Sequence, residues 1–278
     1  MMRSDGTRPT PSGSSIYHQQ WLPSGQEPRA VLAIVHGFGE YTGLYVPVAE
    51  FFVGQGMAVF AMDLRGHGRS PGARGFIHAW SDYREDVATL LGLARKTLPG
   101  TPVFLLGNSL GGLIAIDYAL HDPAGLRGLI AMSPAVGKIG VAKFLLWLSR
   151  VLSRVWPSFT LDSGIDSEAM TRDKNVAARI EADPLVHGRG SARLGTEVQD
   201  TIARVREQAG ALAVPILLQH GDADTVTDPE DSRWFFERIR ISDKELRLYP
   251  GSYHNLCIDL NWKEVLQDSA AWITHRLS

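Results

Sequence analysis

Short apolar segments alternate with longer amphipathic segments along most of this chain. The short segments have the length and composition of β-strands, and the longer ones have the spacing of α-helices. The predicted strands cover residues 17–22, 30–35, 57–62, 103–106, 129–132, 215–219 and 245–249. The predicted helices cover residues 46–53, 81–98, 113–120, 229–239 and 262–276. This order predicts an α/β fold with a mostly parallel central sheet and helices on both faces.

The alternation stops between residues 133 and 214, where helical patterns and loops occur without a convincing strand. We interpret residues 136–208 as a cap inserted over one edge of the sheet, and residues 16–135 and 209–278 as the core. Residues 1–15 are polar and rich in Ser, Pro and Gly, so we expect a flexible tail there.

Within the predicted cap, one hydrophobic stripe follows helical spacing. It comprises Phe144, Leu148, Val151, Leu152 and Val155, with Leu145, Trp147 and Trp156 beside it. One interpretation is that the stripe packs the cap onto the core. The other is that part of it lines an acyl-chain tunnel, with Trp147, Leu148 and Leu152 touching substrate, or contacts a membrane surface. Both interpretations stay open at the level of sequence.

Composition excludes several classes of function. The net charge of −2, the pI near 6.5 and the lack of a Lys/Arg block give no reason to expect nucleic acid as a partner. One cysteine, Cys257, cannot form an intrachain disulfide. No signal peptide and no run of 18 apolar residues is evident, so we expect a cytoplasmic protein, with peripheral membrane contact left open.

The residues with the most chemical information are Gly107-Asn108-Ser109-Leu110-Gly111. They match G-x-S-x-G between a predicted strand and a predicted helix, the setting in which a strained turn exposes a nucleophilic serine. A second match, around Ser70, lies among glycines and before Pro71, where no helix can start. We therefore predict Ser109, and not Ser70, as the nucleophile.

A serine nucleophile needs a base and an acid to orient that base. In this class of fold the chain order is serine, acid, histidine, which leaves four histidines: His187, His220, His254 and His275. We favour His254, because it follows the last predicted strand in a loop that can reach back to the serine. The loop Gly221-Asp222-Ala223-Asp224 offers two candidate acids, and the residues alone leave both open.

A third part of the site is His36-Gly37-Phe38-Gly39, directly after an apolar strand. An oxyanion hole requires the backbone N–H of the residue after the nucleophile and one from such a loop. These donors are Leu110 and Phe38. We expect the side chain of His36 to brace the loop by hydrogen bonds.

In these motifs the chain resembles the α/β-hydrolase superfamily and, more narrowly, the monoacylglycerol lipase and lysophospholipase group of serine hydrolases. The matching stretches begin at His36, Asp63, Gly107, Asp183 and Gly221 and end at His254. The resemblance implies an α/β-hydrolase fold with a helical cap after the sixth strand, Asp224 as the acid, Glu40 near the substrate, and no metal or organic cofactor.

The chain departs from the group at three positions. Asn108 stands where the group commonly has His, and eukaryotic members have Arg at Leu44 and His at Cys257, near the glycerol end of the pocket. The resemblance implies hydrolysis of lipid-like carboxylic esters such as monoacylglycerols or lysophospholipids. The alternatives are a carboxylesterase for short or medium-chain esters and a non-enzymatic binding protein on a hydrolase scaffold.

Overall fold

The structure is a computed structural model, and it describes residues 1–277. Its centre is an eight-stranded sheet in the order β1-β2-β4-β3-β5-β6-β9-β10. The strands are β1 (Met2–Pro9), β2 (Ser15–Leu22), β3 (Val31–Val35), β4 (Ala58–Met62), β5 (Val103–Asn108), β6 (Gly128–Met132), β9 (Ile216–Gly221) and β10 (Lys244–Tyr249). From β4 to β10 all neighbours are parallel, whereas β1 and β2 pair antiparallel at one edge. The α/β-hydrolase fold predicted from the sequence is thereby confirmed.

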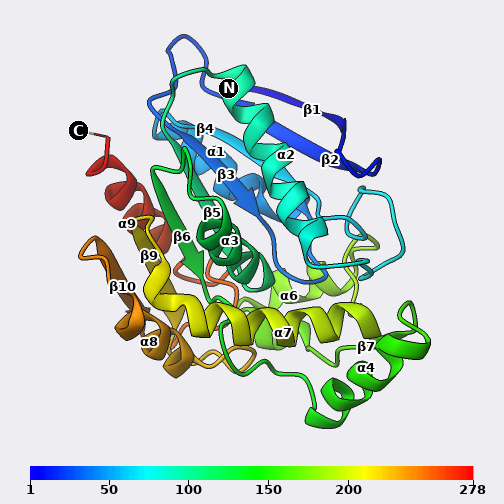
Figure 1. The fold of residues 1–278 in the computed structure, drawn as a ribbon. Helices are drawn as coiled ribbons and strands as arrows, with labels where there is room; N and C mark the ends of the chain where they lie inside the picture. The colour runs from blue at the N-terminus through cyan, green and yellow to red at the C-terminus, as the bar shows by residue number, and fades with distance from the viewer. Residues whose placement is uncertain (278) are drawn as a thin grey trace.

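Helices cover both faces of the sheet (Figure 1). The helices of the core are α1 (Val46–Gly54), α2 (Ser81–Thr97), α3 (Leu110–His121), α8 (Pro229–Arg238) and α9 (Trp262–Thr274). Side chains of α1 and α9 pack on one face, and those of α2, α3 and α8 pack on the other. Successive residues of β3 alternate between these two clusters, which explains why the parallel strands are apolar throughout.

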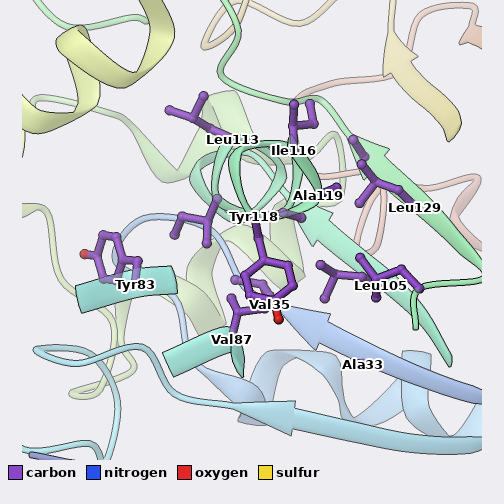
Figure 2. Close-up of a cluster of buried hydrophobic side chains, with 14 of the residues drawn as sticks. Ala33, Val35, Tyr83, Val87, Leu105, Leu113, Ile116, Tyr118, Ala119 and Leu129 are labelled. Atoms are coloured by element: carbon purple, nitrogen blue, oxygen red, sulfur yellow. The ribbon is translucent and has the colours of Figure 1, made fainter. Parts of the chain in front are cut away.

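Figure 2 shows the larger cluster, in which α2 and α3 meet the middle of the sheet. Tyr83 and Val87 of α2 face α3, and Val35 and Leu105 project from the strands below. All four side chains are buried. This packing anchors the helix that begins one residue after Ser109, and so holds that turn against the sheet.

The N-terminal residues differ from the expected flexible tail. Met2–Pro9 form β1, which pairs along its whole length with β2. The strand is polar and mostly exposed, so backbone hydrogen bonds at the sheet edge hold it in place. A hydrophobic pattern cannot reveal a strand of this kind.

Cap-like helices follow β6, as expected for an insertion after the sixth strand. They are α4 (Lys143–Val155), α5 (Ser167–Met170), α6 (Lys174–Glu181) and α7 (Ala192–Gln208), with a short antiparallel pair, β7 (Thr160–Asp162) and β8 (Arg189–Ser191), that the sequence did not suggest. In Figure 1 α4, α6 and α7 lie together at the lower end of the molecule. Helix α7 also packs on α3, and its Val198 and Val205 belong to the main core.

The hydrophobic stripe of α4 does not pack onto the core as one interpretation expected. Phe144 is 65% exposed and Val155 is 77% exposed, and Trp147 and Val151 share the same open face. The buried face of α4 is formed by Ser149 and Ser153, and α4 packs against α7. Small residues allow the two helices to approach closely, which leaves the large apolar side chains outside. Within residues 1–277, no helix has the length and apolar character needed to cross a membrane.

Candidate active site

The turn at Ser109 joins β5 directly to α3. Ser109 has φ +55° and ψ −117°, a strained conformation for a residue with a side chain. Gly107 and Gly111, two residues before and after Ser109, leave room for the close backbone contacts that this turn requires. A Cβ on Gly107 would lie 2.1 Å from the carbonyl oxygen of Gly111, and one on Gly111 would lie 2.2 Å from that of Val35. Both positions therefore exclude any side chain.

The structure brings Ser109, His254 and Asp224 into one hydrogen-bonded row. Nε2 of His254 lies 2.8 Å from Oγ of Ser109, and Nδ1 of His254 lies 2.7 Å from Oδ2 of Asp224. A carboxylate can only accept, so Nδ1–H donates to Asp224 and Nε2 is free to accept from the serine hydroxyl. This is the geometry required of a serine nucleophile, its base and the acid that orients the base.

Asp224 is held by five donors. Its Oδ1 accepts from the backbone N–H of Val226 and Thr227, while Oδ2 accepts from His254, from His220 at 3.0 Å and from the Thr227 hydroxyl at 2.8 Å. Burial alone would raise the pKa of Asp224, but the charge of His254 and the imidazole hydrogen bonds outweigh it and hold that pKa well below its ordinary value. Asp224 is thus ionised whenever the site is assembled.

Asp222, the other candidate acid, lies outside this row. Its Oδ1 accepts from the backbone N–H of Gly251 and stabilises the turn that precedes His254. His220 was weighed as a base and instead hydrogen-bonds to Asp224, on the same Oδ2 that accepts from His254, while its Nδ1 lies 2.7 Å from Oγ of Ser232. Chain order could not have revealed this role.

The two N–H groups expected to form the oxyanion hole have no hydrogen-bond acceptor in the described chain. Leu110 begins α3, so its N–H has no acceptor within the helix. The N–H of Phe38 has no hydrogen-bond acceptor anywhere in the described chain. His36 braces this loop as expected, because its Nε2 accepts from the backbone N–H of Leu64 at 2.9 Å.

Glu40 stabilises the loop that carries Phe38 through hydrogen bonds to its carboxylate. Its Oε2 accepts from the N–H of Gly37 at 2.8 Å and from the hydroxyl of Tyr45 at 2.6 Å, and its Oε1 accepts from Asn255 at 2.6 Å. Asn255 follows His254 in the chain. The carboxylate therefore links the Phe38 loop to the loop that carries His254.

A cluster of imidazole rings joins this loop to the cap. The ring of His187 lies 4.8 Å from that of His67 and packs edge-on against Phe38, while its backbone N–H donates to the carbonyl of Gly39 at 3.1 Å. Burial lowers the pKa of both His67 and His187, and the neighbouring imidazoles lower it further. Both rings are therefore neutral at pH 7. The sequence assigned no role to either histidine in this contact.

The second G-x-S-x-G match has a structural role. Oγ of Ser70 donates to the carbonyl of Asp63 and accepts from the N–H of Tyr17 at 2.8 Å. Ser70, Asp63 and Tyr17 are all buried. The two hydrogen bonds connect the glycine-rich loop to β2. Ser70 therefore holds a loop in place, although it lies in the same sequence pattern as Ser109.

Two cavities meet at Ser109, and Phe38 lines both. The first, here called the apolar cavity, is about 120 Å³ and is lined mostly by aliphatic side chains, among them Leu145, Leu146 and Val198. The second, here called the polar cavity, is about 320 Å³. Its lining includes Glu40, Asp162, Asp166, Glu181, His187 and His254.

The substrate-contact residues expected on α4 are not the ones that reach a cavity. Trp147, Leu148 and Leu152 line neither cavity, whereas Leu145, Leu146 and Ser149 line the apolar one. The periodicity predicted the helix but could not say which face turns inward. Glu40 does line the polar cavity.

Leu44 and Cys257, the two departures expected near the glycerol end of the pocket, line neither cavity at Ser109. Both face a separate hollow beside α6. In the described chain, no three His, Cys, Asp or Glu side chains are grouped so that they could hold a metal ion.

Comparison with known proteins places this geometry in a family. The model of the family described as "Serine aminopeptidase, S33" matches residues 26–261. The chain is 34% identical over 267 residues to a monoacylglycerol lipase of Mycolicibacterium smegmatis, covering 95% of each chain. It is 33% identical to a monoglyceride lipase of Mus musculus, covering 96% of this chain and 89% of that protein.

A solved structure gives the same result. The monoacylglycerol lipase of Paleococcus ferrophilus superposes with a TM-score of 0.86 at 33% identity, over 94% of this chain and 99% of that one. The chain therefore belongs to the serine aminopeptidase S33 family of α/β-hydrolases and is a serine hydrolase of its monoacylglycerol lipase-like group.

Proposed function

We propose that this enzyme hydrolyses the carboxylic ester bond of lipid-like substrates, namely monoacylglycerols or lysophospholipids. The observation that carries the proposal is the position of Ser109 at the junction of the two cavities. An acyl chain fits the apolar cavity, because its aliphatic lining replaces water around the chain. The polar alcohol half of the ester then occupies the polar cavity.

In the proposed reaction, Nε2 of His254 accepts the proton of Ser109 as Oγ attacks the acyl carbonyl. The N–H groups of Phe38 and Leu110 stabilise the negative charge that develops on the carbonyl oxygen. His254 then donates the proton to the departing alcohol. Water, activated by the same histidine, attacks the acyl-enzyme and releases the fatty acid. Asp224 keeps the imidazole in the required tautomer throughout.

We propose further that residues 136–208 act as a cap that touches a lipid surface through α4. The exposed face of this helix carries Phe144, Trp147, Val151 and Val155, with the rings of Phe144 and Trp147 stacked at 6.0 Å. The same helix contains Lys143, Arg150 and Arg154 and no acidic residue, and of these three Arg150 pairs with Asp200 of α7 at 2.8 Å. An apolar face flanked by cations is the composition that binds to the headgroup region of a bilayer.

A chain-length series tests the proposal. Wild-type protein is assayed on p-nitrophenyl esters from acetate to decanoate, and on 1-acylglycerols of the same acids. We expect kcat/KM to rise with chain length, because each added methylene that enters the apolar cavity contributes up to about 0.8 kcal/mol. A profile that falls from acetate onward would instead indicate the short-chain carboxylesterase.

Ser109→Ala is the matched control for this assay. We expect it to fold and to lose hydrolysis to near background, since only its hydroxyl is removed. It should also fail to react with a fluorophosphonate probe that labels the wild type. A wild-type protein that does not label would favour the binding protein, and more than a tenth of wild-type activity in Ser109→Ala would rule out this nucleophile.

A further inference from the structure

The polar cavity beside Ser109 has an unusual charge composition. Its lining contains four carboxylates, Glu40, Asp162, Asp166 and Glu181, and no lysine or arginine. Glu40 is buried and is neutralised in part by the donors described above. The other three are exposed to solvent.

These three carboxylates have no cationic partner in the described part of the chain. Oδ1 of Asp162 accepts only from the N–H of Gly164, and Oδ1 of Asp166 accepts only from that of Glu168. The side chain of Glu181 makes no hydrogen bond or ion pair with any described residue. The polar cavity, which Ser109 also lines, therefore carries three carboxylates that have no ion-pair partner.

No arginine forms an ion pair with these carboxylates in the described chain. Arg189 lies opposite Asp162 in the β7–β8 pair, but it makes no ion pair with it and does not line the polar cavity. Arg172 is paired with Asp259 at 2.8 Å and also donates to Asn261. Arg179 lies on the same helix as Glu181 but lines the separate hollow beside α6. Neither guanidinium lines the polar cavity.

We propose that the polar cavity selects the alcohol half of the substrate by its charge. It accepts uncharged polyols and cationic alcohols, and it rejects alcohols that carry a phosphate or another anion. A concave site lined by charges of one sign concentrates its field, which changes the local concentration of a charged ligand by about 10- to 1,000-fold. The inference rests on the proposed function, and within it favours monoacylglycerols over lysophospholipids, whose phosphate would face the three carboxylates.

The test uses three esters of hexanoic acid that differ only in the charge of the alcohol. They are 1-hexanoylglycerol, hexanoylcholine and 1-hexanoylglycerol 3-phosphate, each kept below its critical micelle concentration so that no lipid surface contributes. Release of hexanoate gives kcat/KM for each. We expect the glycerol and choline esters to exceed the phosphate ester by about 10- to 100-fold at low salt. The difference should shrink at 0.5 M NaCl, because ions screen exposed charges.

A triple variant, Asp162→Asn, Asp166→Asn and Glu181→Gln, connects the selectivity to these residues. The amides keep an oxygen acceptor for the two turns and remove the charge. We expect the preference for the glycerol ester over the phosphate ester to fall about tenfold. The matched control is Glu27→Gln, Glu50→Gln and Glu237→Gln, which changes net charge equally at exposed positions outside the cavity and should leave the preference as in the wild type.

Equal kcat/KM on all three esters would overturn the inference, as would a preference that survives in the triple variant or is lost in the control. Glu181→Gln alone provides the same comparison if the triple variant does not fold, with a smaller loss of preference expected. Failure to hydrolyse all three esters and p-nitrophenyl hexanoate would instead overturn the proposed function itself, so the two failures are distinguishable.

Discussion

Nε2 of His220 lies 3.0 Å from Oδ2 of Asp224, the same oxygen that accepts from His254 at 2.7 Å. Both imidazoles are buried, and His220 is held in turn by Ser232. The carboxylate is therefore fixed between two rings. Its position relative to His254 depends on a residue that contacts neither the nucleophile nor a cavity.

Replacing His220 by Gln should weaken this positioning. Because a small displacement of the acid misdirects the base, we expect kcat to fall by about 10- to 100-fold with KM changed little. The pH profile of kcat should shift as well, since His254 would be paired with a less restrained carboxylate. Ser232→Ala, one step further from the acid, should give a smaller change in the same direction. An unchanged kcat in His220→Gln would show that the backbone donors suffice.

Asp224 and Asp222 should respond differently to the same substitution. Asp224→Asn removes the charge that stabilises the His254 imidazolium, and we expect kcat to fall by about 10³- to 10⁴-fold. Asp222→Asn keeps an oxygen that can accept from Gly251, so we expect kcat within a few-fold of wild type. Steady-state rates on one p-nitrophenyl ester compare the two. A larger loss in Asp222→Asn would reverse the assignment of the acid.

The imidazole cluster should make stability depend on pH. The pKa values of His67 and His187 are lowered in the folded protein, so the unfolded chain binds more protons below its ordinary histidine pKa of about 6.5. Above that pH these two histidines should not reduce the free energy of unfolding. As the pH falls below it, the free energy of unfolding should decrease. Thermal unfolding from pH 7.5 to 5 measures the effect.

His187→Gln should flatten this pH dependence, because one imidazole fewer in the cluster has to be kept neutral. His121→Gln, at an exposed histidine outside the cluster, serves as the control and should retain the wild-type slope. Equal slopes in the two variants would place the pH sensitivity elsewhere in the protein.

Two glycine substitutions should have opposite effects on stability. Gly111→Ala puts a Cβ 2.2 Å from the carbonyl oxygen of Val35, and overpacking of this kind costs about 1–3 kcal/mol or more. Gly92→Ala, in the interior of α2, meets no atom within 4 Å and should stabilise the helix by about 0.5–1 kcal/mol. Denaturant unfolding compares the two, and a neutral Gly111→Ala would mean that the turn can relax.

The exposed face of α4 should matter only when the substrate is in a lipid surface. We expect the double variant Phe144→Ser, Val155→Ser to sediment less with anionic vesicles and to hydrolyse vesicle-borne monoacylglycerol more slowly, while p-nitrophenyl butanoate is cleaved as by the wild type. Leu260→Ser removes another apolar side chain, 62% exposed, from a different surface and is the control. Equal losses in both proteins would argue against a specific role for α4.

Much of the fold follows from local pattern. In the eight-stranded sheet, strands β2 to β6, β9 and β10 occur within a few residues of where periodicity and turn residues predict them, as do helices α1, α2, α3, α8 and α9. Strand β1 is the exception, because its sequence is polar and only its pairing with β2 defines it. Helix α4 was predicted as a helix, but its buried face was not.

Local sequence signals identified which serine stands between a strand and a helix, and they placed two candidate acids, Asp222 and Asp224, before His254 in the order of a hydrolase, while the choice of Asp224 came from the family resemblance. These signals are local: a turn that needs glycine at two positions, and strands whose ends carry polar residues. Only the tertiary contacts show that His220 supports Asp224, that Leu145 and Leu146 rather than Trp147 line the apolar cavity, and that three carboxylates without ion-pair partners line the polar cavity beside Ser109. Those facts depend on contacts between residues distant in the chain, and pairing of distant residues leaves no mark in a single sequence.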